Sequence, residues 1–465
     1  MKPALAMQKF LYLLLLLWNA AQASSLPPTV TTALQQAGIP LQHVGIVVWD
    51  SNQNEPQLSI NATRSFNPAS TMKLVTSYTA LGLLGPAYTW PTEISTDGIL
   101  HDGILDGNLY IKGYGDPSLN IERFWQLLHQ LRLHGLHQIN GELILDQSYF
   151  QPAPASAFDD QPRRAYNAQP AALMVNFNST AIDISVHDNR IEINAEPLPI
   201  NAKLINRVSL STAACTEWLD QIHSEWRADS QQLIISGEYP ASCSEKAFAV
   251  TLGDASELAA GLFTSLWQSQ GGKFQGNWRN GVTPDTAQHL LTYTSPPLAL
   301  AVYDMNKFSN NVMARNLFLS LSQDGSASTA KSAQVVHDWL QQQNLHFPEL
   351  VLENGAGLSR IERIAPGNMA RLLRSAYHSP VYVELAAALP IVAVDGTMKK
   401  RGKNDLVAAH AHIKTGTLDG VKTLAGYVTT RAGHQVVVVF FINDAHASAG
   451  NAAQDALLEW VYQNQ

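Results

Sequence analysis

The first and last parts of the chain carry apolar runs that predict the strands of one sheet. Residues 43–50 (H-V-G-I-V-V-W-D) and 434–443 (H-Q-V-V-V-V-F-F-I-N) are almost continuously apolar, which favours strands. Residues 412–416 and 423–430 are also strand-like, and R-A-G joins the second of them to 434–443 as a hairpin. Residues 449–463 have the periodicity of a closing amphipathic helix. We therefore expect both ends of the chain to complete one antiparallel sheet.

Shorter patterns near the N-terminus add to this picture. Residues 27–40 predict a short helix, and residues 57–61 begin a second strand after a turn. The stretch F-N-P-A-S-T-M-K at residues 66–73 leads into the apolar run L-V-T-S-Y-T-A-L-G-L-L. This run predicts a helix with Ser70 at its mouth.

The middle of the chain has a different pattern. Residues 93–288 contain many short strand-like runs broken by Gly, Asp and Asn, such as N-L-Y-I-K-G-Y-G-D-P and Q-L-I-I-S-G-E-Y-P. A chain of 465 residues is too long for one ordinary core. We predict an α+β fold in which residues 24–92 and 289–465 form one discontinuous domain, an antiparallel sheet flanked by helices. Residues 93–288 are expected to be a β-rich insertion of two subdomains.

Residues 1–23 have the features of a signal peptide. Lys2 and Lys9 make a positive start, a nine-residue apolar run follows, and A-Q-A at residues 21–23 is a small-residue cleavage site. The apolar run is short for a membrane span, and no later segment predicts one. We expect cleavage near Ala23, export to the periplasm and a mature chain without a transmembrane anchor.

Charge and cysteine content narrow the classes of partner and cofactor. The formal net charge is −8, and removal of residues 1–23 would make it two units more negative, which argues against nucleic acid as a partner. The two cysteines, Cys215 and Cys243, can close a loop of about thirty residues with one disulfide in an oxidising compartment. No histidine or further cysteine lies at ligand spacing from them, so we expect no metal site and no cofactor.

Ser70 and Lys73 suggest nucleophilic catalysis. Residues three apart share one face of a helix. Burial and the positive end of the helix dipole both favour the neutral form of a lysine there, and a neutral amine beside a hydroxyl is a base beside a nucleophile. A second S-x-x-K match, Ser328–Lys331, lies in the polar stretch S-A-S-T-A-K-S. We predict that it is part of a loop leading into a helix over residues 333–343.

Two further motifs fit the first. Ser309 and Asn311 form S-x-N at a predicted helix start, and I-K-T-G-T places Lys414 at the end of a predicted strand, followed by Thr415, Gly416 and Thr417. Neither motif is specific alone, since S-x-N also occurs elsewhere in the chain. The informative feature is the ordered set of S-x-x-K, S-x-N and K-T-G, each on the element that the chemistry needs.

This set resembles the penicillin-recognising serine acyltransferases, namely penicillin-binding proteins and serine β-lactamases. The large insertion between Ser70 and Ser309 resembles the D-alanyl-D-alanine carboxypeptidase/endopeptidase family, the class C low-molecular-mass penicillin-binding proteins (peptidase family S13). Residues 113–119 (G-Y-G-D-P-S-L), 354–360 (N-G-A-G-L-S-R) and 389–401 also look like that family. The chain departs from it where D-G-S-G is more usual than N-G-A-G, and at Asn310, where Asp is common.

The resemblance implies roles for the motif residues. Ser70 would attack a carbonyl while Lys73 takes its proton, and the backbone N–H groups of Ser70 and Thr417 would hold the oxyanion. Ser309 would relay protons. The resemblance also implies contacts with the substrate. Asn311 would contact an amide, and Lys414 and Thr415 would contact a carboxylate. Gly416 would allow the strand edge to approach the substrate closely.

The implied activity is cleavage of terminal D-Ala from peptidoglycan stem peptides and of D-alanyl cross-links, with β-lactams as covalent inhibitors. Asp146 and Arg360 are candidates to bind the zwitterionic end of diaminopimelate, with Phe150 as a further candidate, although Asp146 also suits a turn after a strand. A serine β-lactamase is the alternative enzyme, but both Glu-Pro pairs, at Glu55 and Glu196, precede Ser309, the wrong order for class A. The remaining alternative is a catalytically silent cell-wall-binding protein.

Overall fold

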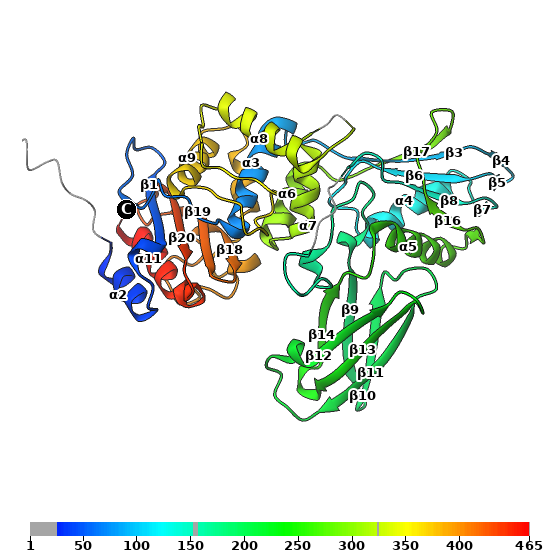
Figure 1. Cartoon of the computed structure of the whole chain (residues 1–465), viewed down its shortest axis with the longest axis horizontal. Helices are drawn as coiled ribbons and strands as arrows, with labels where there is room; N and C mark the ends of the chain where they lie inside the picture. The colour runs from blue at the N-terminus through cyan, green and yellow to red at the C-terminus, as the bar shows by residue number, and fades with distance from the viewer. Residues whose placement is uncertain (1–25, 152–156, 323–324, 465) are drawn as a thin grey trace, which may run out of the picture.

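The two ends of the chain share one sheet in the computed structural model, which describes residues 26–151, 157–322 and 325–464 (Figure 1). Its strands are β1 Val44–Asp50, β2 Leu58–Ile60, β18 Ala411–Leu418, β19 Val421–Thr429 and β20 Gln435–Asn443. The order across the sheet is β18-β19-β20-β1-β2, and every neighbouring pair is antiparallel. The prediction that both termini complete one antiparallel sheet is therefore confirmed. The predicted signal peptide, residues 1–23, lies outside the described residues.

Helices cover both faces of this sheet (Figure 1). Ile46 and Val48 of β1 pack with one helical layer, whereas Val47 and Trp49 face a second core on the other side. Burial on both faces explains why the strands are apolar at nearly every position. The first layer consists of α2 Pro28–Gln36 and α11 Asn451–Asn464. The second consists of α3 Lys73–Leu84, α6 Leu298–Lys307, α7 Asn311–Ser320, α8 Thr329–Gln342, α9 Pro366–Tyr377 and α10 Tyr382–Ala388.

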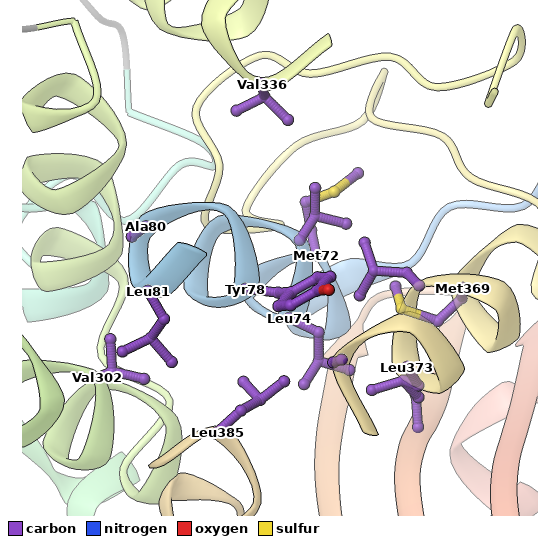
Figure 2. Packing of buried hydrophobic residues seen from close by; sticks show 14 of the residues in the cluster. Met72, Leu74, Tyr78, Ala80, Leu81, Val302, Val336, Met369, Leu373 and Leu385 are labelled. Atoms are coloured by element: carbon purple, nitrogen blue, oxygen red, sulfur yellow. The ribbon is translucent and has the colours of Figure 1, made fainter. Parts of the chain in front are cut away.

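Helix α3 lies at the centre of the second layer. Every residue from Lys73 to Leu81 is buried, and Figure 2 shows Leu74, Tyr78 and Leu81 surrounded by side chains that include Leu373 and Leu385. A helix that is buried all round is held on every side. The predicted helix begins three residues later than Ser70, because Ala69–Met72 form a 3-10 turn and the α-helix starts at Lys73.

Two paired strands connect the middle segment, residues 93–288, to the rest of the chain. β3 and β17 are antiparallel neighbours, so the segment starts and ends side by side, although both strands extend past the predicted limits. The domain limits at residues 92 and 289 therefore remain a proposal. The strands of this part are β3 Pro91–Thr96, β4 Ile99–His101, β5 Ile104–Asp106, β6 Leu109–Gly113, β7 Gln138–Ile139, β8 Leu143–Asp146, β9 Thr180–His187, β10 Arg190–Glu196, β11 Lys203–Ser211, β12 Ile222–Arg227, β13 Gln232–Pro240, β14 Glu245–Val250, β15 Lys273–Phe274, β16 Trp278–Asn280 and β17 Gln288–Thr294.

Two separate cores fill this segment. One joins the sheets β16-β8-β6-β3-β17 and β15-β7-β5-β4 to helices α4 Ile121–Leu133 and α5 Ala255–Ser269. The other lies between the sheets β10-β9-β14 and β11-β13-β12, which project to one side in Figure 1. A disulfide joins Cys215 and Cys243 beside this second core, with an S–S distance of 2.07 Å. Within the described residues, none of the helices combines the length and apolar character that a membrane crossing requires.

Candidate active site

Ser70 lies on a tightly held turn between the sheet and helix α3. Ala69, just before it, has a φ of +45°, a strained conformation for a residue other than glycine and one that recurs at functional sites. Two hydrogen bonds fix this turn, one at a backbone amide and one at a backbone carbonyl. Asn67 accepts from the backbone N–H of Ala69 at 2.9 Å, and Thr423 of β19 donates to the carbonyl of Pro68 at 2.7 Å. Ser70 is thereby held at a defined place beside the sheet.

Lys73 is a buried amine in contact with the Ser70 hydroxyl. Its Nζ lies 3.1 Å from Ser70 Oγ and donates to Asn311 Oδ1 and the carbonyl of Ala356, both at 2.6 Å. The side chain has 0% exposure. Burial, and then the positive charge of Lys414, hold the pKa of Lys73 well below its ordinary value. A neutral amine at hydrogen-bond distance can take the proton of a serine, and a lowered pKa favours that form.

Lys414, which is fully buried, contacts the partly exposed Ser309. Lys414 Nζ donates to Ser309 Oγ at 2.9 Å and to the carbonyl of Thr415 at 2.8 Å. Burial lowers the pKa of Lys414 to about 7. Ser309 has a φ of +55°, and Asn310 caps helix α7 by accepting from the N–H of Met313. Asn310 thus caps the helix, as the Asp that is more usual at this position could also do.

The burial of Lys414 predicts a distinctive dependence of stability on pH. Unfolding returns its pKa from about 7 to 10.5, so between these values the unfolded chain holds a proton that the folded chain lacks. The free energy of unfolding of the wild type should therefore rise with pH in this window, relative to Lys414→Met, by at most about 1.4 kcal/mol per pH unit. Urea unfolding of both proteins from pH 6 to 10 measures this difference. Parallel curves would contradict the burial of a titrating Lys414.

One cavity of about 540 Å³ brings the three motifs together. The pair of threonine hydroxyls at Thr397 and Thr415 lies in its wall, with the two oxygens 2.8 Å apart. The motif residues that line the cavity are Ser70, Ser309, Asn311, Thr415, Gly416 and Thr417. Lys73 and Lys414 lie behind this surface, fully buried. Residues of all three motifs thus lie at one open space.

Gly416 has a packing role in addition to the expected one. We expected its lack of a side chain to let the substrate approach the strand edge. In the structure, a Cβ atom at Gly416 would lie 2.3 Å from Thr423 Oγ1, 2.8 Å from the backbone nitrogen of Ser70 and 2.9 Å from Ala69 Cβ. Glycine therefore lets strand β18 approach the Ser70 turn itself.

The structure places Asp146 and Phe150, two of the residues expected to contact the substrate side chain, outside the lining of this cavity. Asp146 is fully buried at the end of β8, where its carboxylate accepts from the backbone N–H groups of Ser148 at 2.9 Å and Thr283 at 2.7 Å. This is the turn role that the sequence left open. Phe150 is buried in a small apolar cluster with Leu319 and its neighbours. Both side chains therefore stabilise the structure around them, Asp146 by hydrogen bonds and Phe150 by apolar packing.

Arg360 and Asp159 do line the cavity. Arg360 lies over the ring of Phe158 at 4.5 Å and donates to the carbonyl of Asp419 at 3.1 Å. Asp159 accepts from Tyr166 Oη at 2.8 Å. Burial alone would raise the pKa of Asp159, but hydrogen bonds and the positive charge of Arg360 lower it. Asp159 and Arg360 thus both line the cavity wall, which Asp146 does not.

The remaining predictions concern the second S-x-x-K match and metals. Ser328 caps helix α8 by accepting from the N–H of Lys331, so the helix begins at Thr329, earlier than the predicted start at residue 333. The predicted loop is wrong at this point, although the match is structural as expected. In the parts of the chain that the structure describes, no three His, Cys, Asp or Glu side chains gather in a way that could hold a metal ion.

Comparisons with known proteins agree over most of the chain. Residues 27–464 match the model of the D-Ala-D-Ala carboxypeptidase 3 (S13) family. A D-alanyl-D-alanine carboxypeptidase, DacB, of Haemophilus influenzae is 29% identical over 86% of this chain and 85% of its own length. A D-alanyl-D-alanine carboxypeptidase of Actinomadura sp. is 26% identical over 94% of this chain and 85% of its own.

Solved structures support the fold. The crystal structure of penicillin binding protein 4 from Haemophilus influenzae has a TM-score of 0.76 with this chain and is 26% identical, covering 93% of this chain and 99% of that one. The same protein in complex with a β-lactam has a TM-score of 0.73 at 25% identity, covering 94% and 100%. The α+β fold predicted from the motifs, with its sheet flanked by helices, is thus confirmed.

Proposed function

This chain belongs to the D-Ala-D-Ala carboxypeptidase 3 (S13) family and is a peptidase of the hydrolase class, and on that basis we propose that it releases terminal D-Ala from peptidoglycan stem peptides through an acyl-enzyme on Ser70. The observation that carries the proposal is the contact of the buried Lys73 amine with Ser70 Oγ at 3.1 Å. A low pKa and this geometry are the two properties that a general base needs.

The proposed reaction begins with acylation. Ser70 Oγ attacks the carbonyl carbon of the penultimate D-Ala, and its proton passes to Lys73. The backbone N–H groups of Ser70 and Thr417 stabilise the developing oxyanion. Asn311 uses its Oδ1 to accept from Lys73, which leaves Nδ2 to donate to a substrate amide carbonyl. This division of the Asn311 amide follows from its own chemistry, because the amide oxygen accepts hydrogen bonds and the amide nitrogen can only donate them.

The leaving group and the terminal carboxylate meet the second pair of residues. The D-Ala carboxylate lies against Thr415, in front of the buried Lys414, whose Nζ contacts Ser309 at 2.9 Å. The proton that Lys73 took from Ser70 passes through Ser309 to the leaving amine, which leaves Lys73 neutral again. Water then attacks the acyl carbon and gives its proton to Lys73, and this proton returns to Ser70 Oγ when the acyl bond breaks. Penicillins present a comparable amide carbonyl, so we propose that they acylate Ser70 and block it. The β-lactam complex of the Haemophilus influenzae relative supports this proposal.

The stem-peptide side chain is proposed to lie between Asp159 and Arg360. Diaminopimelate ends in an ammonium and a carboxylate, which suit an Asp–Arg pair. Both residues line the cavity that contains Ser70. Cleavage of D-alanyl cross-links is proposed at the same site, since it breaks the same D-Ala acyl bond with the side-chain amine of a second stem as the leaving group. These substrates lie outside the cytoplasm, in line with the proposed export.

Substrate choice provides a direct prediction. Asp159→Asn should lower kcat/KM by about 10-fold or more for pentapeptides with diaminopimelate at the third position, because a charged hydrogen-bond partner is lost. A pentapeptide with alanine there should be affected less than about 3-fold. Release of D-Ala from both peptides measures this. Asp160→Asn is the matched control, since Asp160 is the exposed neighbour. Equal losses on both peptides would contradict the assignment.

The proposed reaction itself is tested by D-Ala release from a pentapeptide and by digestion of cross-linked muropeptide dimers. The wild type should release D-Ala and cleave the dimer, and Ser70→Ala should do neither. Rapid penicillin hydrolysis without D-Ala release would indicate a β-lactamase. Binding of peptidoglycan without turnover would indicate a silent binding protein.

A further inference from the structure

The catalytic site buries three basic side chains beside one carboxylate. Lys73 and Lys414 have 0% exposure and Arg315 of helix α7 has 8%, while Glu362 has 0% exposure. The charge of Glu362 acts on both Lys73 and Arg315, and the exposed Glu353 acts on Arg315 as well. Burying an ionisable carboxylate is costly unless it is paired with opposite charge or hydrogen bonds. The burial of Glu362 beside these three basic groups suggests that its carboxylate has a specific role.

Glu362 anchors the loop that binds Lys73. Its Oε1 accepts from three successive backbone N–H groups, those of Glu353 at 3.1 Å, Asn354 at 2.9 Å and Gly355 at 3.0 Å. The next residue along, Ala356, provides the carbonyl to which Lys73 Nζ donates at 2.6 Å. The carboxylate thus holds the loop immediately before the acceptor of the proposed base.

The same loop is fixed to helix α3 at a second point. The carbonyl of Gly355 accepts from Thr76 Oγ1 at 2.6 Å, one turn along the helix from Lys73. Anchoring uses only one oxygen of Glu362, because Oε2 is buried and makes no hydrogen bond within the described residues. A glutamine amide oxygen could accept the three N–H bonds equally well. The use of a carboxylate therefore points to a role for its charge.

We propose that Glu362 is a positioning residue that holds the Ala356 carbonyl against Lys73 and supplies negative charge beside the buried basic groups. The proposal rests on the proposed role of Lys73 as the base. The groups that face Lys73 are Lys414 from β18, Arg315 from α7 and Glu362 from the loop. Of these three only Glu362 favours the protonated amine, and its removal should make Lys73 easier to deprotonate.

The pH profile of acylation separates charge from anchoring. Glu362→Gln keeps an acceptor for the three N–H groups but removes the charge. The second-order rate of acylation by benzylpenicillin falls at low pH as Lys73 becomes protonated, and this acid limb should move to lower pH by at least about half a unit in Glu362→Gln. The plateau rate should stay within about 3-fold of the wild type. Glu362→Ala, which loses both functions, should be slowed by about 10-fold or more.

Controls make each outcome decisive. Glu353→Gln, an exposed acid on the same loop, should leave the limb unmoved, and Glu362→Asp, which keeps the charge, should shift it far less than Glu362→Gln. An unchanged limb in Glu362→Gln would overturn the inference, as would a lower rate at every pH without a shift. If Glu362→Gln fails to fold while Glu362→Asp folds, the charge is structural and the inference is also overturned. A wild type that benzylpenicillin does not acylate would instead refute the proposed function.

Discussion

Replacing Lys73 with methionine is expected to slow acylation by benzylpenicillin by about 10³-fold, within the range of about 10² to 10⁴ that a general base contributes. The reason is that Lys73 is the amine within hydrogen-bond distance of Ser70 Oγ, at 3.1 Å, and its burial favours the neutral, proton-accepting form. The second-order rate of acylation measures the effect. Methionine is unbranched and apolar, so it can fill the buried space.

The matched control is Lys331→Met, which removes the lysine of the second S-x-x-K match on helix α8. This variant should acylate within about 2-fold of the wild type, because surface substitutions have small effects. Thermal melts of both variants check folding, since Lys73→Met leaves Asn311 Oδ1 and the Ala356 carbonyl without the donor that they have in the wild type. A folded Lys73→Met that acylates within 10-fold of the wild type would show that another group is the base.

The second large effect is expected for Gly357→Ala. Gly357 has a φ of +80°, and a Cβ atom there would lie 1.8 Å from the carbonyl oxygen of Ala69 and 2.7 Å from the backbone nitrogen of Ser70. Such contacts require the Ser70 turn to shift. A shift of the nucleophile by about 1 Å can cost about 100-fold in rate, so we expect acylation to fall by about that much or more. Rates of benzylpenicillin acylation and thermal melts report the two effects.

Gly433→Ala separates this clash from backbone strain. Gly433 has a φ of +87° but would place its Cβ atom with nothing within 4 Å. Both substitutions carry the cost of a left-handed alanine, about 1–2 kcal/mol, whereas only Gly357→Ala displaces the turn. We expect Gly433→Ala to be mildly destabilised with normal acylation. Equal acylation by the two variants would show that the loop around Gly357 does not set the position of Ser70.

The apolar pattern of the sequence was sufficient to predict the central sheet. Strands β1 and β20 are buried on both faces, so they read as unbroken apolar runs, and their positions are close to the predicted ones. Element ends were less predictable. The helix after Ser70 starts at Lys73 because a 3-10 turn precedes it, and helix α8 starts at Thr329 because Ser328 caps it. Both outcomes depend on local hydrogen bonds that periodicity does not encode.

The motif residues were predictable because their order along the chain reflects the chemistry of one site. Ser70, Ser309 and Thr417 come from distant segments and line one cavity. The residues proposed to contact the substrate side chain were not predictable in this way. Asp146 ends a strand and is used by its own turn, while Asp159 follows in an irregular segment without periodicity. Its approach to Arg360 depends on tertiary packing, which no local pattern reveals.

Glu362 was missed for a related reason. Its sequence surroundings, S-R-I-E-R-I, place it between arginines, where an exposed ion pair would be the usual interpretation. In the structure it is fully buried and serves three backbone N–H groups. The apolar neighbour Ile364, which is buried, was a signal in the sequence that this segment reaches the interior, whereas Ile361 is exposed. The sequence does not reveal this buried charge, because the basic groups around it come from three different elements of the fold.

The central claim is that Ser70 is the nucleophile, and intact mass against time, with excess benzylpenicillin, tests it most directly. We predict a long-lived adduct of one penicillin per chain that maps to Ser70, is absent in Ser70→Ala and persists in Ser328→Ala. An adduct retained in Ser70→Ala, or no adduct and no penicillin hydrolysis in the wild type, would contradict the claim.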